Sequence, residues 1–245
     1  MASILDRYGI KEVADVTFYK ISDGSDGKQP GEPTVPVLYL DTLKVSTIEQ
    51  TAENTSARGG KGNPELIMWD YGKEITVTIE DALFSAKSMA IMYGSVDMDG
   101  DAQLKDATTI LKTVRKEQVV NGKININGTE VTPTNPAYYK ADGSTGDDSD
   151  YDYMTFELPI VGKEITISAN TFPGAYYVTG DTYARSEVTG QDEFFQFILP
   201  KAKITSEVTL TMEAEGDPST FSMNLKVLRP ADGEMMKLVK YSVAD

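Results

Sequence analysis

The sequence predicts a mainly β protein: an antiparallel β-sandwich or barrel with one flanking α-helix and long projecting loops. Three observations support this prediction. Apolar and polar residues alternate with a period of two in the best-defined segments, one segment alone has helical spacing, and polar stretches rich in glycine, proline or aspartate separate the apolar segments.

The clearest alternation lies in residues 74–80, where Ile75, Val77 and Ile79 share one face and glutamate or threonine occupies the other. A strand of this kind packs its apolar face on a core and leaves the other face in water. The same pattern predicts strands at 164–168, 207–213 and 221–227. Many β-branched and aromatic residues predict further strands at 16–21, 35–45, 109–116, 154–158, 176–183 and 194–204.

Residues 81–92 break the period of two, because their apolar residues recur at helical spacing. Asp81 can cap the N-terminus of a helix there, and Gly94 follows its end. We expect one helix of about three turns that packs on the strands and buries Phe84.

Three polar stretches predict loops, at 22–33, 50–63 and 143–152. The stretch 50–63 contains Ala57-Arg58-Gly59-Gly60-Lys61-Gly62 and lies between two strands. A compact domain rarely keeps so long a connection without using it. We therefore expect this loop to contact a partner, with Trp69 as a large apolar anchor beneath it.

The 245 residues contain no internal repeat and no clean linker, so the sequence predicts a single elaborated β domain over 1–245. The middle of the chain, 95–170, is interpreted as an insertion or an enlarged loop region. Residues 1–20 lack the apolar run of a signal peptide. This predicts a protein folded in a cytoplasm.

The composition excludes several function classes. Lys and Arg number 23 against 38 for Asp and Glu, which gives a net charge of −15 and disfavours binding to nucleic acid or to an anionic membrane. The chain has no histidine and no cysteine, so imidazole acid–base catalysis, thiolate nucleophiles and zinc sites built from these residues are ruled out. We expect no enzymatic activity and no cofactor.

Other motifs give weaker hypotheses. The Gly59–Gly62 run lacks the spacing of a phosphate-binding loop. Carboxylates alternate at Asp97, Asp99 and Asp101, as in a calcium loop, but Ala102 and Thr108 depart from the EF-hand pattern. A solvated turn and a weak calcium site both remain open there, and the same holds for the four aspartates of 147–152. The locally basic segment 105–123 is expected to face acidic surface of a neighbouring copy.

The order of several segments is informative. A strand that ends near Val45 leads to the Gly59–Gly60 loop and then into WDYGKEITVTIEDALF at 69–84. Downstream lie FPGAYYV at 172–178, TGQDEFFQF at 189–197 and LTMEAEGDPSTF at 210–221. This order resembles the major tail (tube) proteins of tailed bacteriophages. The resemblance covers residues 35–94 and 171–241.

The resemblance implies a structural protein of a phage virion, in which β-sandwich copies form stacked, hexameric rings and a continuous inner barrel. It implies that rings contact each other through the long loop, with these candidate residues: Thr51, Asn54, Arg58, Gly59, Gly60 and Lys61. The implied partners are other copies of the chain, tape-measure and tail-terminator or baseplate proteins, and a sheath if the tail is contractile. The implied location is the virion tail, assembled in the host bacterial cytoplasm.

The polar face of the 74–80 strand can line a water-filled bore through which DNA is ejected. A bore with negative potential repels phosphates, so DNA would slide through it without specific binding. The candidate luminal acids are Glu80, Glu207 and Glu213. The alternative function is a monomeric β-sandwich binding module for a sugar or calcium, in a fibre or a capsid decoration.

Overall fold

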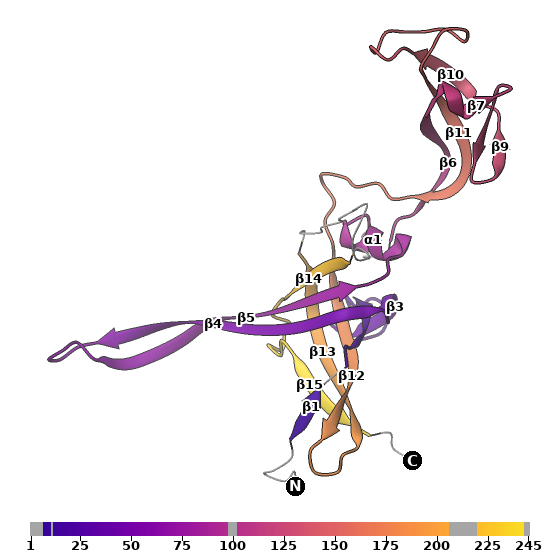
Figure 1. Cartoon of the computed structure of the whole chain (residues 1–245). Helices are drawn as coiled ribbons and strands as arrows, with labels where there is room; N and C mark the ends of the chain where they lie inside the picture. The colour runs from indigo at the N-terminus through magenta and orange to yellow at the C-terminus, as the bar shows by residue number, and fades with distance from the viewer. Residues whose placement is uncertain (1–6, 11, 98–101, 206–219, 243–245) are drawn as a thin grey trace. The chain divides into compact units, whose positions relative to one another are not determined.

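Antiparallel strands dominate the chain, as the alternation predicts (Figure 1). The computed structural model describes residues 7–10, 12–97, 102–205 and 220–242. The predicted strand at 207–213 and most of the predicted calcium loop lie outside these residues. No helix among the described residues is long and apolar enough to cross a membrane.

The chain divides into two compact units. The first, here called the body, consists of 1–103 and 165–245, and the second, the inserted unit, is Leu104–Glu164. The body contains β1 (Tyr8–Ile10), β2 (Asp15–Ile21), β3 (Pro33–Leu40), β4 (Leu43–Arg58), β5 (Glu65–Asp81), α1 (Ala86–Met92), β12 (Ala175–Ser186), β13 (Asp192–Ile204), β14 (Phe221–Val227) and β15 (Lys237–Tyr241).

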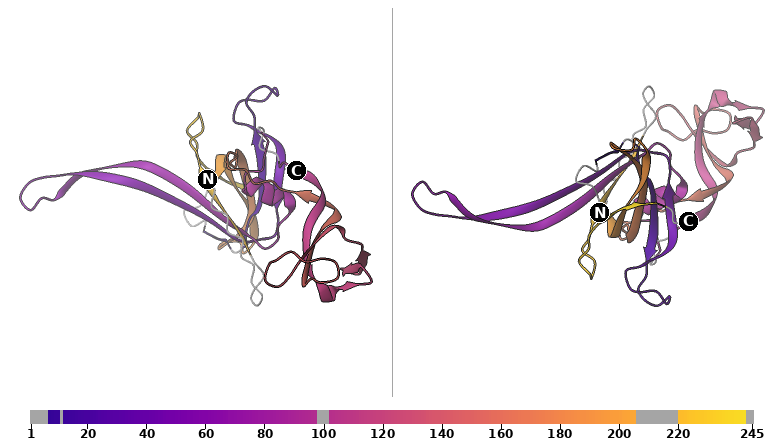
Figure 2. Two further views of the ribbon diagram at one scale, coloured as in Figure 1. Left: turned by 90° about the horizontal axis from the view of Figure 1, so that it is seen from above. Right: turned by 90° about the horizontal axis from the view of Figure 1, so that it is seen from below.

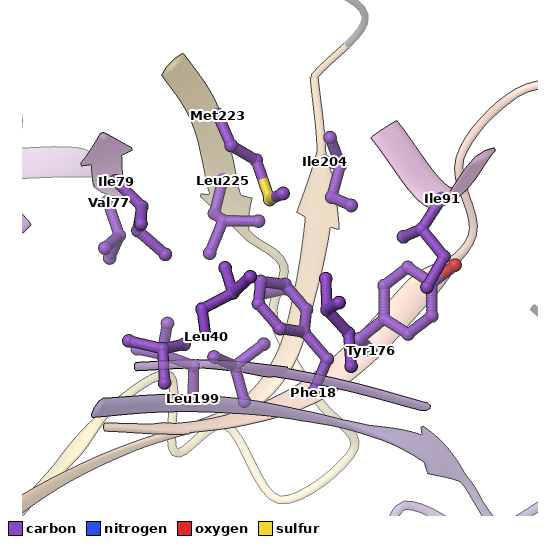
Figure 3. Packing of buried hydrophobic residues seen from close by; sticks show 14 of the residues in the cluster. Phe18, Leu40, Val77, Ile79, Ile91, Tyr176, Leu199, Ile204, Met223 and Leu225 are labelled. Carbon is purple, nitrogen blue, oxygen red and sulfur yellow. The ribbon is translucent and has the colours of Figure 1, made fainter. Parts of the chain in front are cut away.

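The body is built on one nine-stranded sheet: seven strands follow the order β3-β2-β12-β13-β14-β5-β4, and off this path β1 pairs with β12 and β15 pairs with β13. Strand β13 has two partners along one edge. Its first half, Phe194–Ile198, pairs with β15, and its end, Ala202–Ile204, pairs with β14. The inner faces of β2, β3, β5, β12, β13 and β14 contribute to a common core with α1 (Figure 3). That core includes the side chains predicted to point inward from β5, Ile75, Val77 and Ile79.

One glycine is required by the core. Gly180 on β12 is the cross-strand partner of Phe197 on β13. A Cβ atom at position 180 would lie 2.0 Å from the Phe197 ring, closer than any van der Waals contact allows. The ring, which is 4% exposed, therefore lies over the glycine in place of a neighbouring side chain.

Helix α1 is shorter than predicted and begins later. Asp81 ends β5, where its buried carboxylate accepts hydrogen bonds from Thr42 Oγ1 at 2.5 Å and from the Leu83 amide at 3.2 Å. Ser85 caps the helix instead, in a reciprocal capping box with Ser88. The prediction that Phe84 is buried was wrong: it precedes the helix and is 57% exposed, with one side of its ring near Phe221.

The end of α1 agrees with the prediction. Gly94 follows the C-cap Tyr93 and has a φ of +74°, a conformation that favours glycine. A Cβ atom there would lie 2.7 Å from the backbone of Phe172. Gly94 thus lets the segment before β12 pass closely over the helix end.

The inserted unit has two three-stranded sheets and its own small core. One sheet has the order β10 (Thr134–Tyr139), β11 (Tyr153–Glu164), β6 (Lys105–Arg115), and the other consists of β7 (Val119–Val120), β8 (Lys123–Ile126) and β9 (Thr129–Val131). None of the predicted strands covers β10 or the three strands β7, β8 and β9. The signal for β7, β8 and β9 was present as two Asn-Gly turns, in which Asn121, Gly122, Asn127 and Gly128 all have positive φ.

Three further predictions differ from the structure. The predicted strand 35–45 is divided at 41–42 into β3 and the start of β4. The predicted strand 164–168 is absent, because β11 ends at Glu164 and irregular chain follows. Residues 50–58, predicted to be loop, continue β4. In contrast, 22–32 form turns without a strand, as predicted.

We predict that Gly180→Ala lowers the free energy of unfolding by about 1–3 kcal/mol or more, because the added methyl displaces the Phe197 ring. Urea unfolding followed by circular dichroism measures this change. Gly9→Ala is the matched control, since a Cβ atom at position 9 meets nothing within 4 Å. Equal stability of the two variants would contradict the packing described for β12 and β13.

Candidate assembly interface

The longest hairpin of the body extends beyond the core. Strands β4 and β5 stay paired from Leu43 and Asp81 at one end to Arg58 and Glu65 at the other. Both views in Figure 2 show this ribbon projecting from the other strands of the body. We call residues 52–73 the arm. At about 3.4 Å per residue, its seven steps from residue 52 to residue 59 reach roughly 24 Å.

The arm ends in a tight, glycine-rich turn. The Gly59 amide donates to the Pro64 carbonyl at 3.2 Å, and the Asn63 amide donates to the Gly60 carbonyl at 3.1 Å. Gly60, Gly62 and Asn63 have positive φ, which explains why small or amide residues occupy these positions. Just before the turn, the Arg58 guanidinium forms an exposed ion pair with Glu65 at 3.5 Å.

The predicted contact residues all lie along this hairpin. Thr51 pairs with Glu74 at the base of the arm, Asn54 pairs with Asp70 midway, and Arg58 pairs with Glu65 at the end. Gly59, Gly60 and Lys61 form the start of the turn. The structure corrects the conformation: the segment is a strand up to Arg58, because backbone pairing with β5 replaces the predicted irregular loop.

The arm carries a row of exposed apolar residues that the sequence analysis did not assign to it. Five large apolar side chains of β5 are each more than half exposed: Leu66, Ile67, Met68, Trp69 and Tyr71. The prediction that Trp69 is an anchor beneath a loop was wrong, since it is 52% exposed and belongs to neither of the two core clusters formed by the described residues. Leu66, Ile67, Met68 and Trp69 are consecutive, so both faces of the ribbon carry exposed apolar side chains.

A β-bulge determines which face of the ribbon Tyr71, Trp69 and Ile67 occupy. Between the pairs Thr51–Glu74 and Glu53–Tyr71, β5 contains one residue more than β4, and Gly72 has a φ of +63° there. Because directly paired residues share a face, Tyr71 lies on the same face as Glu74. Ile67 and Trp69 continue that face toward the turn, opposite Ala57 and Thr55.

This arrangement is typical of a protein interface. An isolated two-stranded hairpin is only marginally stable in water, and large exposed apolar patches mark sites where another molecule binds. Tryptophan and tyrosine supply most of the binding energy in many interfaces. The apolar residues of the arm therefore form a surface suited to binding another molecule. The polar residues on β4 keep the arm hydrated in the free chain.

The candidate luminal acids are only partly described. Glu80 lies on the polar face of β5, half-buried between its cross-strand partners Ser222 and Val45. On the same face, Glu74 forms an ion pair with Lys226 at 2.8 Å. That face therefore carries both signs of charge. Glu207 and Glu213 lie outside the described residues.

The aspartates of the 143–152 loop stabilise that loop through local hydrogen bonds and an ion pair. Asp147 Oδ1 accepts hydrogen bonds from the amide and hydroxyl of Ser149, which lower the pKa of the Asp147 carboxyl. Asp150 pairs with Lys140, and Asp152 accepts from the Ala141 amide at 2.7 Å. In the described part of the chain, no three acidic side chains converge in a way that could hold a metal ion.

The basic segment 105–123 finds partners within the inserted unit. Lys123 pairs with Glu130 at 2.9 Å and Arg115 pairs with Glu117 at 3.7 Å. Asp106, an acid within the segment, pairs with Lys163 at 2.6 Å. Lys116 donates to the Ser149 carbonyl and lies over the Tyr151 ring. Asp106 has a lowered pKa because it accepts a hydrogen bond from Lys163. These pairs occupy much of the charge that the sequence analysis assigned to a neighbouring copy.

Comparison with known proteins gives two matches. The model of the YomU/Tube protein family matches residues 8–240. A curated relative, described as a tail tube protein of Bacillus phage SPR, is 22% identical over 253 aligned positions, which cover 94% of this chain and 87% of the relative.

We predict that two substitutions on the same strand have very different effects on the isolated chain. Trp69→Ala should change the free energy of unfolding by less than about 0.5 kcal/mol, because the side chain packs on no core. Ile79→Ala should cost about 2–5 kcal/mol, because Ile79 is 1% exposed. Urea unfolding at a concentration that keeps the chain monomeric tests both, and comparable losses would show that the arm packs on the body.

Proposed function

Because the chain belongs to the YomU/Tube protein family, we propose that it is a structural subunit of a phage tail tube and that its copies form stacked hexameric rings through which DNA is ejected. The match over residues 8–240 supports the tail tube role, since it includes the body, the arm and the inserted unit. The exposed apolar row on the arm is the observation on which the assembly proposal rests.

The arm supplies contacts between copies. No layer in the described part of the chain covers its apolar side chains, and its reach of roughly 24 Å is enough to cross onto a neighbouring subunit. Burial of apolar area gives about 25 cal/mol per Å², so covering several large side chains contributes several kcal/mol per contact. Repetition of this contact around and along a tube makes the assembly stable.

The body supplies the wall of the tube. In this proposal the polar face of β5, with Glu74, Thr76, Thr78 and Glu80, faces a water-filled bore. The net charge of −15 keeps phosphates from binding along that path. DNA then passes without specific binding.

The remaining parts of the proposal follow from the role in the virion. The partners are other copies of this chain and the tape-measure, tail-terminator or baseplate proteins, with a sheath if the tail is contractile. The location is the virion tail after assembly in the host bacterial cytoplasm. The role needs no catalysis and no cofactor.

Removal of the arm tests the assembly proposal. Residues 52–73 are replaced by Asn-Gly, so that the natural pair Thr51–Glu74 flanks a two-residue turn of the type that joins antiparallel strands. We expect this variant to remain folded, since it loses no buried core residue, and to form no tubes by negative-stain microscopy. The full-length chain should form rings or tubes under the same conditions.

A control separates loss of the arm from loss of its apolar residues. Trp69→Ser with Ile67→Ser keeps the ribbon and its charges but removes two apolar side chains of one face. We expect this variant to behave like the shortened one. Long tubes from either variant, or a full-length chain that stays monomeric and binds a sugar or calcium, would contradict the proposal.

The proposed bore gives a second prediction. Glu80→Lys should leave tubes intact, because a wide, wet channel solvates a charge of either sign. DNA ejection from particles that carry the variant should slow at low ionic strength, since each added cation creates phosphate contacts that salt weakens. Ejection at the normal rate at low salt, from tubes shown to contain the substitution, would contradict a luminal position for Glu80.

A further inference from the structure

The outer face of the body sheet, on the side away from the core, carries a row of aromatic side chains. Tyr183 on β12, Phe194 on β13 and Tyr241 on β15 are consecutive cross-strand partners. Their ring centroids are 5.0 Å apart between the first two and 5.4 Å apart between the last two. Each ring is more than a third exposed. We call this row the aromatic ladder.

Two carboxylates lie next to the aromatic ladder on the same face. Asp15 on β2 and Asp181 on β12 are directly opposite each other, a placement that is unfavourable for like charges. Their hydrogen-bond donors are neutral: Gln196 donates to Asp181 at 2.9 Å, the Tyr241 hydroxyl donates to Asp181 at 3.4 Å, and the Tyr39 hydroxyl donates to Asp15 at 3.4 Å. No lysine or arginine among the described residues forms an ion pair with either carboxylate.

The negative potential of this acid pair affects the neighbouring Tyr39 hydroxyl. The charge of Asp15 raises the pKa of the Tyr39 hydroxyl, and partial desolvation, Asp41 and Asp181 add to the effect. Like charges directly opposite each other in a sheet are unfavourable. A cation from another molecule would relieve this repulsion.

A hollow of about 550 Å³ adjoins the aromatic ladder on the side away from the acid pair. Tyr183 and Phe194 line it together with Arg185 and Asp192, which form a two-point ion pair at 2.7 and 2.8 Å. That ion pair lowers the pKa of the Asp192 carboxyl and holds one wall in place. The hollow is thus lined by the exposed aromatic rings of Tyr183 and Phe194 on one side and by the ion-paired Arg185 and Asp192 on the other.

The arm has the chemistry that this surface lacks. One of its faces carries Ile67 and Trp69, and its turn carries Lys61. Lys61 forms no ion pair with any residue that the structure describes, whereas Arg58 is already paired with Glu65. The arm therefore presents apolar side chains followed, in its turn, by the available cation Lys61.

We propose that the outer face of one copy receives the arm of a second copy, with Ile67 and Trp69 against the aromatic ladder and its hollow and Lys61 beside Asp15 and Asp181. The proposal rests on the proposed function, which requires the arm to contact another copy. It adds the identity of the receiving surface.

The spacing of the two surfaces agrees. From the hollow at Arg185 to the acid pair at Asp181 is four residues along β12, or about 13 Å. From Ala57, the partner of Ile67, to Lys61 is also four residues, at most about 13 Å, so the match in spacing applies to Ile67. Trp69, opposite Thr55, is six residues from Lys61, at most about 20 Å, and lies beyond Ile67 along the hollow. The apolar contact would exclude water beside the charged contact, which strengthens the attraction between Lys61 and the acid pair.

A charge exchange tests the proposal. Lys61→Glu and Asp181→Lys are made singly and together in the full-length chain, and the concentration needed for tube formation is measured by light scattering and microscopy. We expect each single variant to raise this concentration about tenfold or more, because each places like charges in contact. The double variant should return it to within about threefold of the original chain, because the pair is restored with reversed signs.

Two controls separate the contact from general effects. Asp181→Lys places a cation opposite Asp15, so the thermal stability of the monomer should not fall while assembly is lost. If that variant does not fold, Asp15→Lys replaces it with the same expectation. Asp148→Lys, on an exposed loop of the inserted unit, changes the net charge equally and should assemble normally.

The outcomes are distinct. Normal assembly of both single variants, or a double variant no better than the worse single one, would overturn the proposal, provided that the arm-shortened chain still fails to assemble. In that case the arm contacts another surface and the proposed function stands. Normal assembly of the arm-shortened chain would instead contradict the role of the arm itself.

Discussion

The structure depends on one constraint: a two-stranded ribbon has no second layer to cover its side chains. Strand β5 is covered by other strands of the body at its C-terminal end and belongs to the uncovered ribbon at its N-terminal end. Its Ile75, Val77 and Ile79 are buried because β14 pairs beside them and inward-facing side chains of other body strands pack against them. Among the described residues, Ile67 and Trp69 have only β4 beside them. The apolar area exposed by the arm is therefore stabilising only when a second molecule covers it.

The bulge at Gly72 connects the two halves of this strand. It places Tyr71, Trp69 and Ile67 on the face that holds Glu74, Thr76, Thr78 and Glu80 nearer the body. One face of the ribbon is thus polar where it leaves the body and apolar near the turn. In the proposed assembly the polar part stays in contact with water and the apolar part is covered by a neighbour. Strand β5 then contributes buried residues to the core of its own subunit and contact residues to the interface with the next subunit.

Much of the body was predictable: alternation predicted β14 and the buried part of β5, and β-branched and aromatic residues predicted β2, β12 and β13. The arm was not, since residues 50–58 are polar on both faces and their strand conformation comes from pairing with β5. Phe84 was misplaced because Asp81 and Ser85 compete as caps, and the buried bond of Asp81 to Thr42 favours the later start. The aromatic ladder could not be predicted, because it joins three strands whose register the sequence does not reveal.

The central claim is that the arm is exposed in the free chain and covered on assembly. Trp69 is the single tryptophan of the sequence, so its fluorescence reports on the arm alone. Emission spectra and iodide quenching are compared for dilute monomer and for purified tubes. The account predicts a red, readily quenched emission from the monomer, as expected for a half-exposed indole, and a blue-shifted, protected emission from the tubes. Equal quenching of Trp69 in monomer and tubes would contradict it.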